Sequence, residues 1–147
     1  LHLAQIENAP DATERVPVAD FFQALATRYP AVTLKLDAPP SHVVISSDHL
    51  RSAVSNLLDN ALRHGAGKPV TLRVSSDQGR LLIEVSDQGD GISPANQSRL
   101  FQRFFTTARD DGGTGLGLAI VRAVAERQGG RVDYTTGASG TTFTLRV

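Results

Sequence analysis

Strand-like segments in this chain come in neighbouring pairs, and amphipathic helical segments separate one pair from the next. Alternating apolar and polar residues predict one hairpin from Val70–Val74 and Leu81–Ser86, and a second from Arg131–Thr135 and Thr142–Val147. A doubly wound parallel sheet would instead alternate single strands with helices. The predicted fold class is therefore α+β, a two-layer α/β sandwich whose mixed, mostly antiparallel sheet carries about three helices on one face.

Capping residues and turn residues place the other elements. Asp48 is predicted to be the N-cap of the longest helix, Leu50–His64. Asp20 is predicted to cap a shorter helix that runs through Phe21–Ala26 and is ended by Tyr29–Pro30. The remaining predicted elements are strands at Arg15–Val18, Val32–Leu36 and Val43–Ile45, a short helix at Pro94–Leu100 and an amphipathic helix at Leu118–Gln128.

Length and charge exclude several classes of protein. The 147 residues make one ordinary domain, and 15 acidic residues balance 15 basic ones, so no nucleic-acid partner is predicted. Cysteine is absent, which excludes disulfides and thiolate metal sites. No apolar run reaches the ~18 residues that span a bilayer. The opening Leu1–Glu7 is interpreted as the end of a helix arriving from upstream, so a membrane anchor can precede this chain.

The helix Leu50–His64 carries a polar stripe opposite its apolar side. Asn56, Asn60 and Arg63 lie on this stripe, with His64 at its end. The stripe alone favours a solvated helix face. Asparagine is nevertheless a poor helix former, and amide oxygens can complete the shell of a Mg²⁺ ion already bound to phosphates.

Two glycine-containing segments are candidate ligand sites. Asp87–Gly91 places a carboxylate at a strand end, followed by two glycines that permit close approach of a flat ligand, although a tight turn explains this segment alone. Gly112–Gly117 contains four glycines and runs directly into a helix, which favours a phosphate site over a flexible hinge. Neither the P-loop spacing nor the dinucleotide-binding spacing is present. Phe101–Phe105 is either a small satellite core or the latch of a mobile lid, with Arg103 or Arg109 reaching a phosphate.

In their order and spacing, these segments resemble the catalytic domain of bacterial two-component sensor histidine kinases, in the superfamily that includes DNA gyrase and heat-shock chaperone ATPases. Asn56–His64 resembles the N box, Asp87–Gly91 the first glycine box and Phe101–Phe105 the F box. Gly113–Leu118 resembles the second glycine box, and Gly140–Phe143 the closing glycine-threonine strand. The resemblance implies a Bergerat-type ATP-binding fold.

The resemblance also implies a role for each motif residue. Asn60 would hold Mg²⁺ against the phosphates of ATP, and Asn56 would support the phosphate side as the second catalytic asparagine. Asp87 would accept the adenine amine, helped by Thr141 through water, and residues 93–112 would form a lid. The implied ATP-binding residues are Asn56, Asn60, Arg63, His64, Asp87, Gly89, Gly91, Ile92, Arg103, Phe104, Gly113, Thr114, Gly115, Leu116, Gly117, Leu118 and Thr141.

By the same resemblance, residues 11–147 are the ATP-binding catalytic domain, and residues 1–10 are the end of the upstream dimerisation and phosphoacceptor helix with its linker. The cofactors would be ATP and Mg²⁺, and the γ-phosphoryl acceptor would be a histidine outside this chain. The partners would be that helical hairpin and a response regulator receiver domain. The full-length protein would be a homodimer, with this piece alone able to be monomeric, and the domain would be a cytoplasmic part of an inner-membrane sensor.

Two alternative functions stay open. The first is an ATP hydrolase of the same superfamily, in which a glutamate usually stands four residues before the magnesium asparagine, where this chain has Asn56. The second is a non-catalytic nucleotide-binding or interaction module. The short lid motivates this second alternative, as does Thr106, which stands where many relatives of the kinase family carry a basic residue. Gly65 is a further departure, because it replaces a common Ser or Thr.

Overall fold

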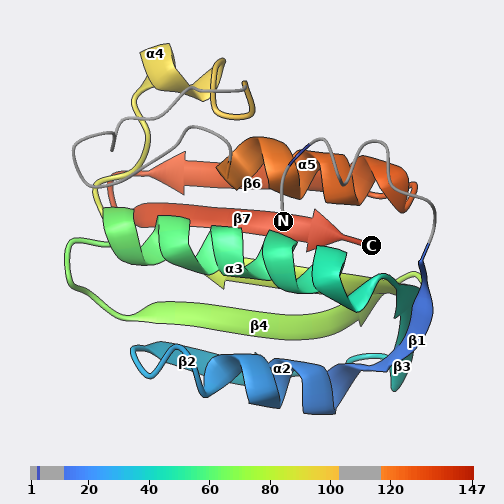
Figure 1. The fold of residues 1–147 in the computed structure, drawn as a ribbon. Helices are drawn as coiled ribbons and strands as arrows, with labels where there is room; N and C mark the ends of the chain where they lie inside the picture. Colours follow the sequence, from blue (N-terminus) through green and yellow to red (C-terminus); the bar gives the residue numbers. More distant parts are fainter. Residues whose placement is uncertain (1–2, 4–11, 103–116) are drawn as a thin grey trace.

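The computed structural model describes residue 3, residues 12–102 and residues 117–147. The described strands and helices follow the predicted order, and Figure 1 shows their arrangement. They are β1 (Glu14–Pro17), α2 (Val18–Ala26), β2 (Val32–Leu36), β3 (His42–Ile45), α3 (Ser47–His64), β4 (Val70–Asp77), β5 (Arg80–Ser86), α4 (Pro94–Gln97), α5 (Gly117–Arg127), β6 (Arg131–Gly137) and β7 (Gly140–Arg146).

The main sheet has five strands in the order β2-β4-β5-β7-β6. Only β2 and β4 pair in parallel, and the other neighbours in this sheet are antiparallel. Strands β1 and β3 pair separately as an antiparallel ribbon. The three longer helices, α2, α3 and α5, lie on one face of the main sheet (Figure 1). The predicted α+β class, the mixed sheet and the single helical layer are therefore confirmed.

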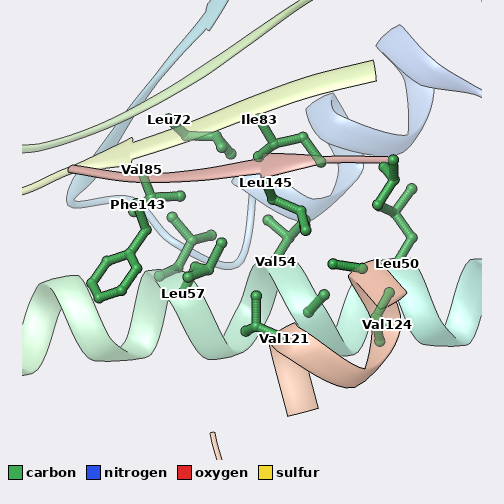
Figure 2. Close-up of a cluster of buried hydrophobic side chains, with 14 of the residues drawn as sticks. Leu50, Val54, Leu57, Leu72, Ile83, Val85, Val121, Val124, Phe143 and Leu145 are labelled. Atoms are coloured by element: carbon green, nitrogen blue, oxygen red, sulfur yellow. The ribbon is translucent and has the colours of Figure 1, made fainter. Parts of the chain in front are cut away.

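The core lies between this helical layer and the sheet. Figure 2 shows Leu50, Val54 and Leu57 of α3 pointing at Ile83 and Leu145 of the sheet, with side chains of α5 beside them. All five of these named side chains are fully buried. Each such burial contributes about 1.5–3 kcal/mol relative to an exposed side chain, so α3 is held mainly by its apolar side. This packing fixes the opposite, polar side of α3.

The structure contradicts both predicted helix caps. Helix α3 begins at Ser47, and its N-cap is Ser46, whose side chain accepts a hydrogen bond from the His49 N–H at 3.3 Å. Asp48 lies in the first turn and pairs with Arg51 at 2.9 Å. Strand β3 ends at Ile45, so a single residue joins strand to helix and must be the cap. Helix α2 likewise begins at Val18, which puts Asp20 in the first turn.

Several predicted bounds also change. Strands β4 and β5 continue to a two-residue turn in which Gln78 (φ 52°) and Gly79 (φ 81°) are both left-handed, as the tightest hairpin turns require. Strands β6 and β7 pair as far as Gly137 and Gly140. Backbone pairing continues here through polar residues because it does not depend on their side chains. Helix α4 ends at Gln97, before the predicted Leu100.

The predicted upstream helix at Leu1–Glu7 lies outside the described residues, apart from Leu3. Leu3 is helical, and its side chain is buried in the hydrophobic core. No helix in the described part of the chain is both long enough and apolar enough to cross a membrane.

Candidate functional site

Asp87 is a buried carboxylate in the residue that directly follows β5. Its side chain is held by backbone groups, because Oδ1 accepts hydrogen bonds from the Gly89 N–H at 2.9 Å and the Thr141 N–H at 3.3 Å. The Asp87 N–H in turn donates to the Thr141 carbonyl at 2.9 Å. Both hydrogen bonds that this carboxylate accepts from described residues end on Oδ1, which leaves the acceptor capacity of Oδ2 for a ligand.

The loop after Asp87 lies against two other segments so closely that only glycine fits. A Cβ added at Gly89 would lie 2.1 Å from the His64 carbonyl oxygen, and one at Gly91 would lie 2.2 Å from the Gly137 carbonyl oxygen. Gly91 also has a positive φ of 83°, which side chains other than glycine rarely adopt. The loop after Asp87 is therefore packed between the end of α3 and the β6–β7 turn.

Gly65 brings the end of α3 to the same place. A Cβ at Gly65 would lie 3.6 Å from the Asp87 Cβ and 2.7 Å from the Ala61 carbonyl oxygen. The last turn of α3 and the Asp87 carboxylate are therefore neighbours, although the whole β4–β5 hairpin lies between them in sequence. The sequence predicts that the helix stops at Gly65–Gly67, and Gly65 is indeed its C-cap, whereas the packing against Asp87 is seen only in the structure.

The polar stripe of α3 has the predicted orientation. Asn56 and Asn60 are half-buried, Arg63 and His64 are exposed, and the residues on the opposite side are buried with one exception. The exception is Leu62, predicted to be on the apolar side, which is 37% exposed. Asn60 therefore stands one turn before the point where α3 meets the Asp87 loop.

Asn56 makes a hydrogen bond within its own helix and lies close to the start of α5. Its amide nitrogen donates to the Ser52 carbonyl oxygen at 2.7 Å, in the preceding turn. Its Oδ1 would lie 3.0 Å from a Cβ added at Gly117, the first residue of α5. Asn56 thus fills the space between the two helices, and glycine at position 117 leaves room for its amide.

Part of the predicted site falls on residues that the structure does not describe. Gly117 and Leu118 are described and half-buried at the start of α5. The described residues brought together are thus Asp87, Gly89, Gly91, Ile92 and Thr141 with the end of α3, and Gly117 with Asn56. The predicted residues outside the described ranges are Arg103, Phe104, Gly113, Thr114, Gly115 and Leu116.

Thr136 is a site neighbour that sequence reasoning missed. Its Oγ1 accepts a hydrogen bond from the Ile92 N–H at 2.8 Å and shares a second one with the Thr141 Oγ1 at 2.8 Å. Thr136 and Thr141 are opposite each other in the β6–β7 register. A correct placement of that hairpin turn was the signal that could have found this pair.

An aromatic group anchors the segment that leaves this loop. The Phe101 ring lies 6.3 Å from the ring centres of both Tyr134 and Phe143. Gln97 donates from Nε2 to the Ile92 carbonyl at 3.0 Å and accepts from the Tyr134 hydroxyl at 3.4 Å. Phe101 thus packs onto the core. The rest of the predicted Phe101–Phe105 segment, apart from Gln102, lies outside the described residues.

The donor set limits what the site can hold. Among the described residues, no three His, Asp or Glu side chains are close enough to form a metal site. The half-buried amide of Asn60 is a neutral oxygen donor, so it fits a Mg²⁺ ion whose other ligands are phosphates and water. The buried Asp87 carboxylate beside tightly packed backbone fits a flat base with an exocyclic amine.

Comparison with known proteins shows which family and fold this chain is similar to. Residues 45–147 match the family model of the histidine kinase-, DNA gyrase B- and HSP90-like ATPases. The chain is 41% identical over 119 residues to the probable sensor histidine kinase TcrY of Mycobacterium tuberculosis, covering 76% of this chain and 25% of that protein. It is 35% identical over 139 residues to the sensor histidine kinase CusS of Escherichia coli K12, covering 91% and 29%. The chain thus spans less than a third of the length of these curated relatives.

Solved structures have the same fold. Full-length ShkA in complex with AMPPNP matches 99% of this chain and 33% of its own, with a TM-score of 0.86 and 25% identity. The mycobacterial sensor histidine kinase MprB matches 92% of this chain and 97% of its own, with a TM-score of 0.71 and 32% identity. The chain therefore belongs to the histidine kinase-, DNA gyrase B- and HSP90-like ATPase family, as an ATP-binding catalytic domain of the sensor histidine kinase type.

Proposed function

We propose that this chain binds ATP with Mg²⁺ and presents the γ-phosphoryl group to a histidine on a dimerisation hairpin of its parent protein. The observation that carries the proposal is the Asp87 carboxylate, which is buried, held through Oδ1 by two backbone N–H groups, and adjacent to the end of the asparagine-bearing helix α3. The AMPPNP complex of the similar ShkA structure supports a nucleotide as the ligand.

In this proposal the protein contributes positioning more than bond chemistry. Asp87 orients the base, Asn60 holds Mg²⁺, and Arg63 and His64 line the exposed end of α3. The described start of α5, at Gly117 and Leu118, follows directly on the segment proposed to wrap the phosphates. Bound Mg²⁺ would neutralise charge on the phosphate oxygens. Phosphoryl transfer through a loose transition state needs mainly such alignment and charge neutralisation.

The structure gives a reason to prefer transfer to a partner over hydrolysis of ATP. A hydrolase needs a general base that activates water, and an amide cannot act as one. At the position concerned the chain has Asn56, whose nitrogen already donates to the Ser52 carbonyl and whose oxygen faces Gly117. We therefore infer that bound ATP is turned over slowly until an acceptor histidine is supplied.

The decisive experiment measures Mg²⁺-dependent binding of a fluorescent ATP analogue. Asp87→Asn should weaken binding by about tenfold to a hundredfold, because a charge-assisted hydrogen bond contributes roughly 1.5–3 kcal/mol. Asp90→Asn is the matched control, since Asp90 is exposed in the same loop. Asn60→Ala should remove the Mg²⁺ dependence. Equal binding by wild type and Asp87→Asn would contradict the proposal.

A second experiment separates a kinase from a non-catalytic binding module. The chain alone should bind ATP without becoming phosphorylated, and adding the dimerisation hairpin of its parent protein should produce acid-labile phosphohistidine on the hairpin. Tight ATP binding with no transfer to the hairpin would favour the non-catalytic module. Radiolabel on the isolated chain would contradict the position of the acceptor outside it.

The same proposal gives the domain a place in its parent protein, a partner and a location in the cell. We place residues 1–10 at the end of the upstream phosphoacceptor helix and residues 11–147 in the catalytic domain. Phosphohistidine would pass to a receiver domain of a response regulator, and the parent protein would be a homodimeric sensor in the inner membrane with this domain in the cytoplasm. The names of the relatives, TcrY and CusS among them, support a sensor protein.

A further inference from the structure

We propose that Thr136 is a positioning residue for the nucleotide base, which acts through Thr141 and through the loop between Asp87 and Ile92. This inference rests on the proposed ATP site and adds a residue to it. Thr136 lies on β6, outside every motif that predicted the site, and its hydroxyl is the point where two parts of that site meet.

The loop is attached to the β6–β7 hairpin at both of its ends. At one end, the Asp87 N–H donates to the Thr141 carbonyl oxygen at 2.9 Å, and the Thr141 N–H donates to the Asp87 Oδ1 at 3.3 Å. At the other end, the Ile92 N–H donates to the Thr136 Oγ1 at 2.8 Å. Gly91 lies between the two ends, and a Cβ there would come within 3.0 Å of the same Thr136 oxygen.

The two threonine hydroxyls connect these attachments. The Thr136 and Thr141 Oγ1 atoms are 2.8 Å apart, and either one can be the donor. A hydroxyl has one proton and two lone pairs, and Thr136 already uses one lone pair for the Ile92 N–H. The bond between the hydroxyls therefore holds the Thr141 Oγ1 beside Thr136, and it also orients the Thr141 O–H where Thr141 is the donor.

Thr141 is buried, and its backbone holds the carboxylate proposed to accept the base amine. Loss of the Thr136 hydroxyl would leave the Ile92 N–H without its acceptor and the Thr141 hydroxyl without its bond to Thr136. Both effects act on the groups that recognise the base and leave the phosphate side unchanged. Adenine presents an amine at C6 to the Asp87 carboxylate, whereas guanine has a carbonyl oxygen at that position, so correct placement of this carboxylate favours adenine.

The test is competition of ATP and GTP against a fluorescent ATP analogue on the whole chain. Thr136→Val, which keeps the shape and removes the hydroxyl, should weaken ATP binding about tenfold and lower the preference for ATP over GTP by a similar factor. Thr136→Ser, which keeps the hydroxyl, should bind ATP within about twofold of wild type.

Thr142→Val is the matched control. It also breaks a hydroxyl pair at 2.8 Å, between Thr142 and Ser86, but Thr142 projects from the opposite face of β7 to Thr141. It should leave the preference for ATP unchanged.

An unchanged ATP-to-GTP ratio in Thr136→Val would overturn this inference, because a purely structural role weakens both nucleotides equally. An equal loss of preference in the Thr142→Val control would overturn it too. In both cases the proposed ATP site stands. Failure of the wild type to bind ATP would overturn the proposed function, and this inference with it.

Discussion

At the scale of single residues, comparing two glycines distinguishes two reasons why a side chain would destabilise the fold: a left-handed backbone angle and a close contact with other backbone. Gly79 and Gly91 have nearly the same φ, 81° and 83°. A Cβ at Gly79 would meet nothing within 4 Å, whereas a Cβ at Gly91 would lie 2.2 Å from the Gly137 carbonyl oxygen. The left-handed angle is thus common to both positions, and the backbone contact belongs to Gly91 alone.

Alanine substitution at these two positions should therefore give unequal losses of stability. Gly79→Ala should cost about 1 kcal/mol of unfolding free energy, the usual cost of a left-handed alanine. Gly91→Ala should cost roughly 2 kcal/mol more, because the opposing atom is backbone and cannot rotate away. Urea unfolding of the two variants measures the difference. Equal losses would show that the Asp87 loop can move away from β6.

The environment of Tyr29 predicts how the stability of the fold changes at alkaline pH. Burial raises the pKa of its phenol above the ordinary value, and the nearby Asp59, which accepts its hydrogen bond at 3.1 Å, acts in the same direction. Above about pH 10 the unfolded chain loses this proton while the folded chain keeps it, so stability falls as pH rises through the folded pKa.

Tyr29→Phe removes this titration and should lose less stability than wild type between about pH 9 and pH 11. The measurement is the urea midpoint of both proteins across that range. All other residues are the same in both proteins, so the comparison isolates the effect of Tyr29. Parallel curves would show that Tyr29 has the same pKa in the folded and unfolded chains.

At the scale of elements, the start of α3 shows that cap chemistry depends on where the preceding strand ends. Ser46 and Asp48 are both good capping residues, and they are two positions apart. Strand β3 keeps its pairing with β1 up to Ile45, opposite Glu14, so the helix begins at once and Ser46 becomes the cap. Asp48 then acts only through the helix dipole and its exposed pair with Arg51.

The two residues should differ in what they contribute to stability. Ser46→Ala should cost about 1 kcal/mol, because the His49 N–H loses its acceptor. Asp48→Ala should cost only a few tenths of a kcal/mol, roughly the value of an exposed pair with a dipole contribution. Thermal unfolding of both variants, measured at the same pH, tests this order. The reverse order would place the cap at Asp48.

At the scale of the whole molecule, the proposed ligand site is built where three separate segments meet. The end of α3, the loop after β5 and the β6–β7 turn lie at one end of the two-layer structure (Figure 1). The apolar side of α3 packs on the sheet that carries the other two segments, so the core itself sets their relative positions (Figure 2). A ligand that contacts all three segments should stabilise the whole fold.

ATP with Mg²⁺ should therefore raise the unfolding temperature of the chain. At a ligand concentration 100 times the dissociation constant, binding adds about 2.7 kcal/mol to the unfolding free energy. Removal of Mg²⁺ with a chelator should take away most of the shift, and Asp87→Asn should show little of it at the same ATP concentration. A full shift in Asp87→Asn would place the nucleotide elsewhere on the chain.

Short-range patterns predicted much of this molecule correctly. The polar stripe on α3, the carboxylate at the end of β5 and both hairpins depend on residues within one helical turn or one strand pair. Their chemistry can be recognised without knowing what packs against them. The errors were local too, at Asp48, Asp20 and Leu100, where the exact end of an element depends on its neighbours in space.

The amino-acid sequence by itself determined the order of elements, the fold class and the residue types of the proposed site, because periodicity and turn chemistry act over short range. Only the tertiary structure decided that a side chain is excluded more strongly at position 91 than at position 79. It alone also decided that Thr136 accepts a hydrogen bond from Ile92, 44 residues away. The physical reason is that such contacts depend on which backbones approach each other once α3 and the sheet have packed together.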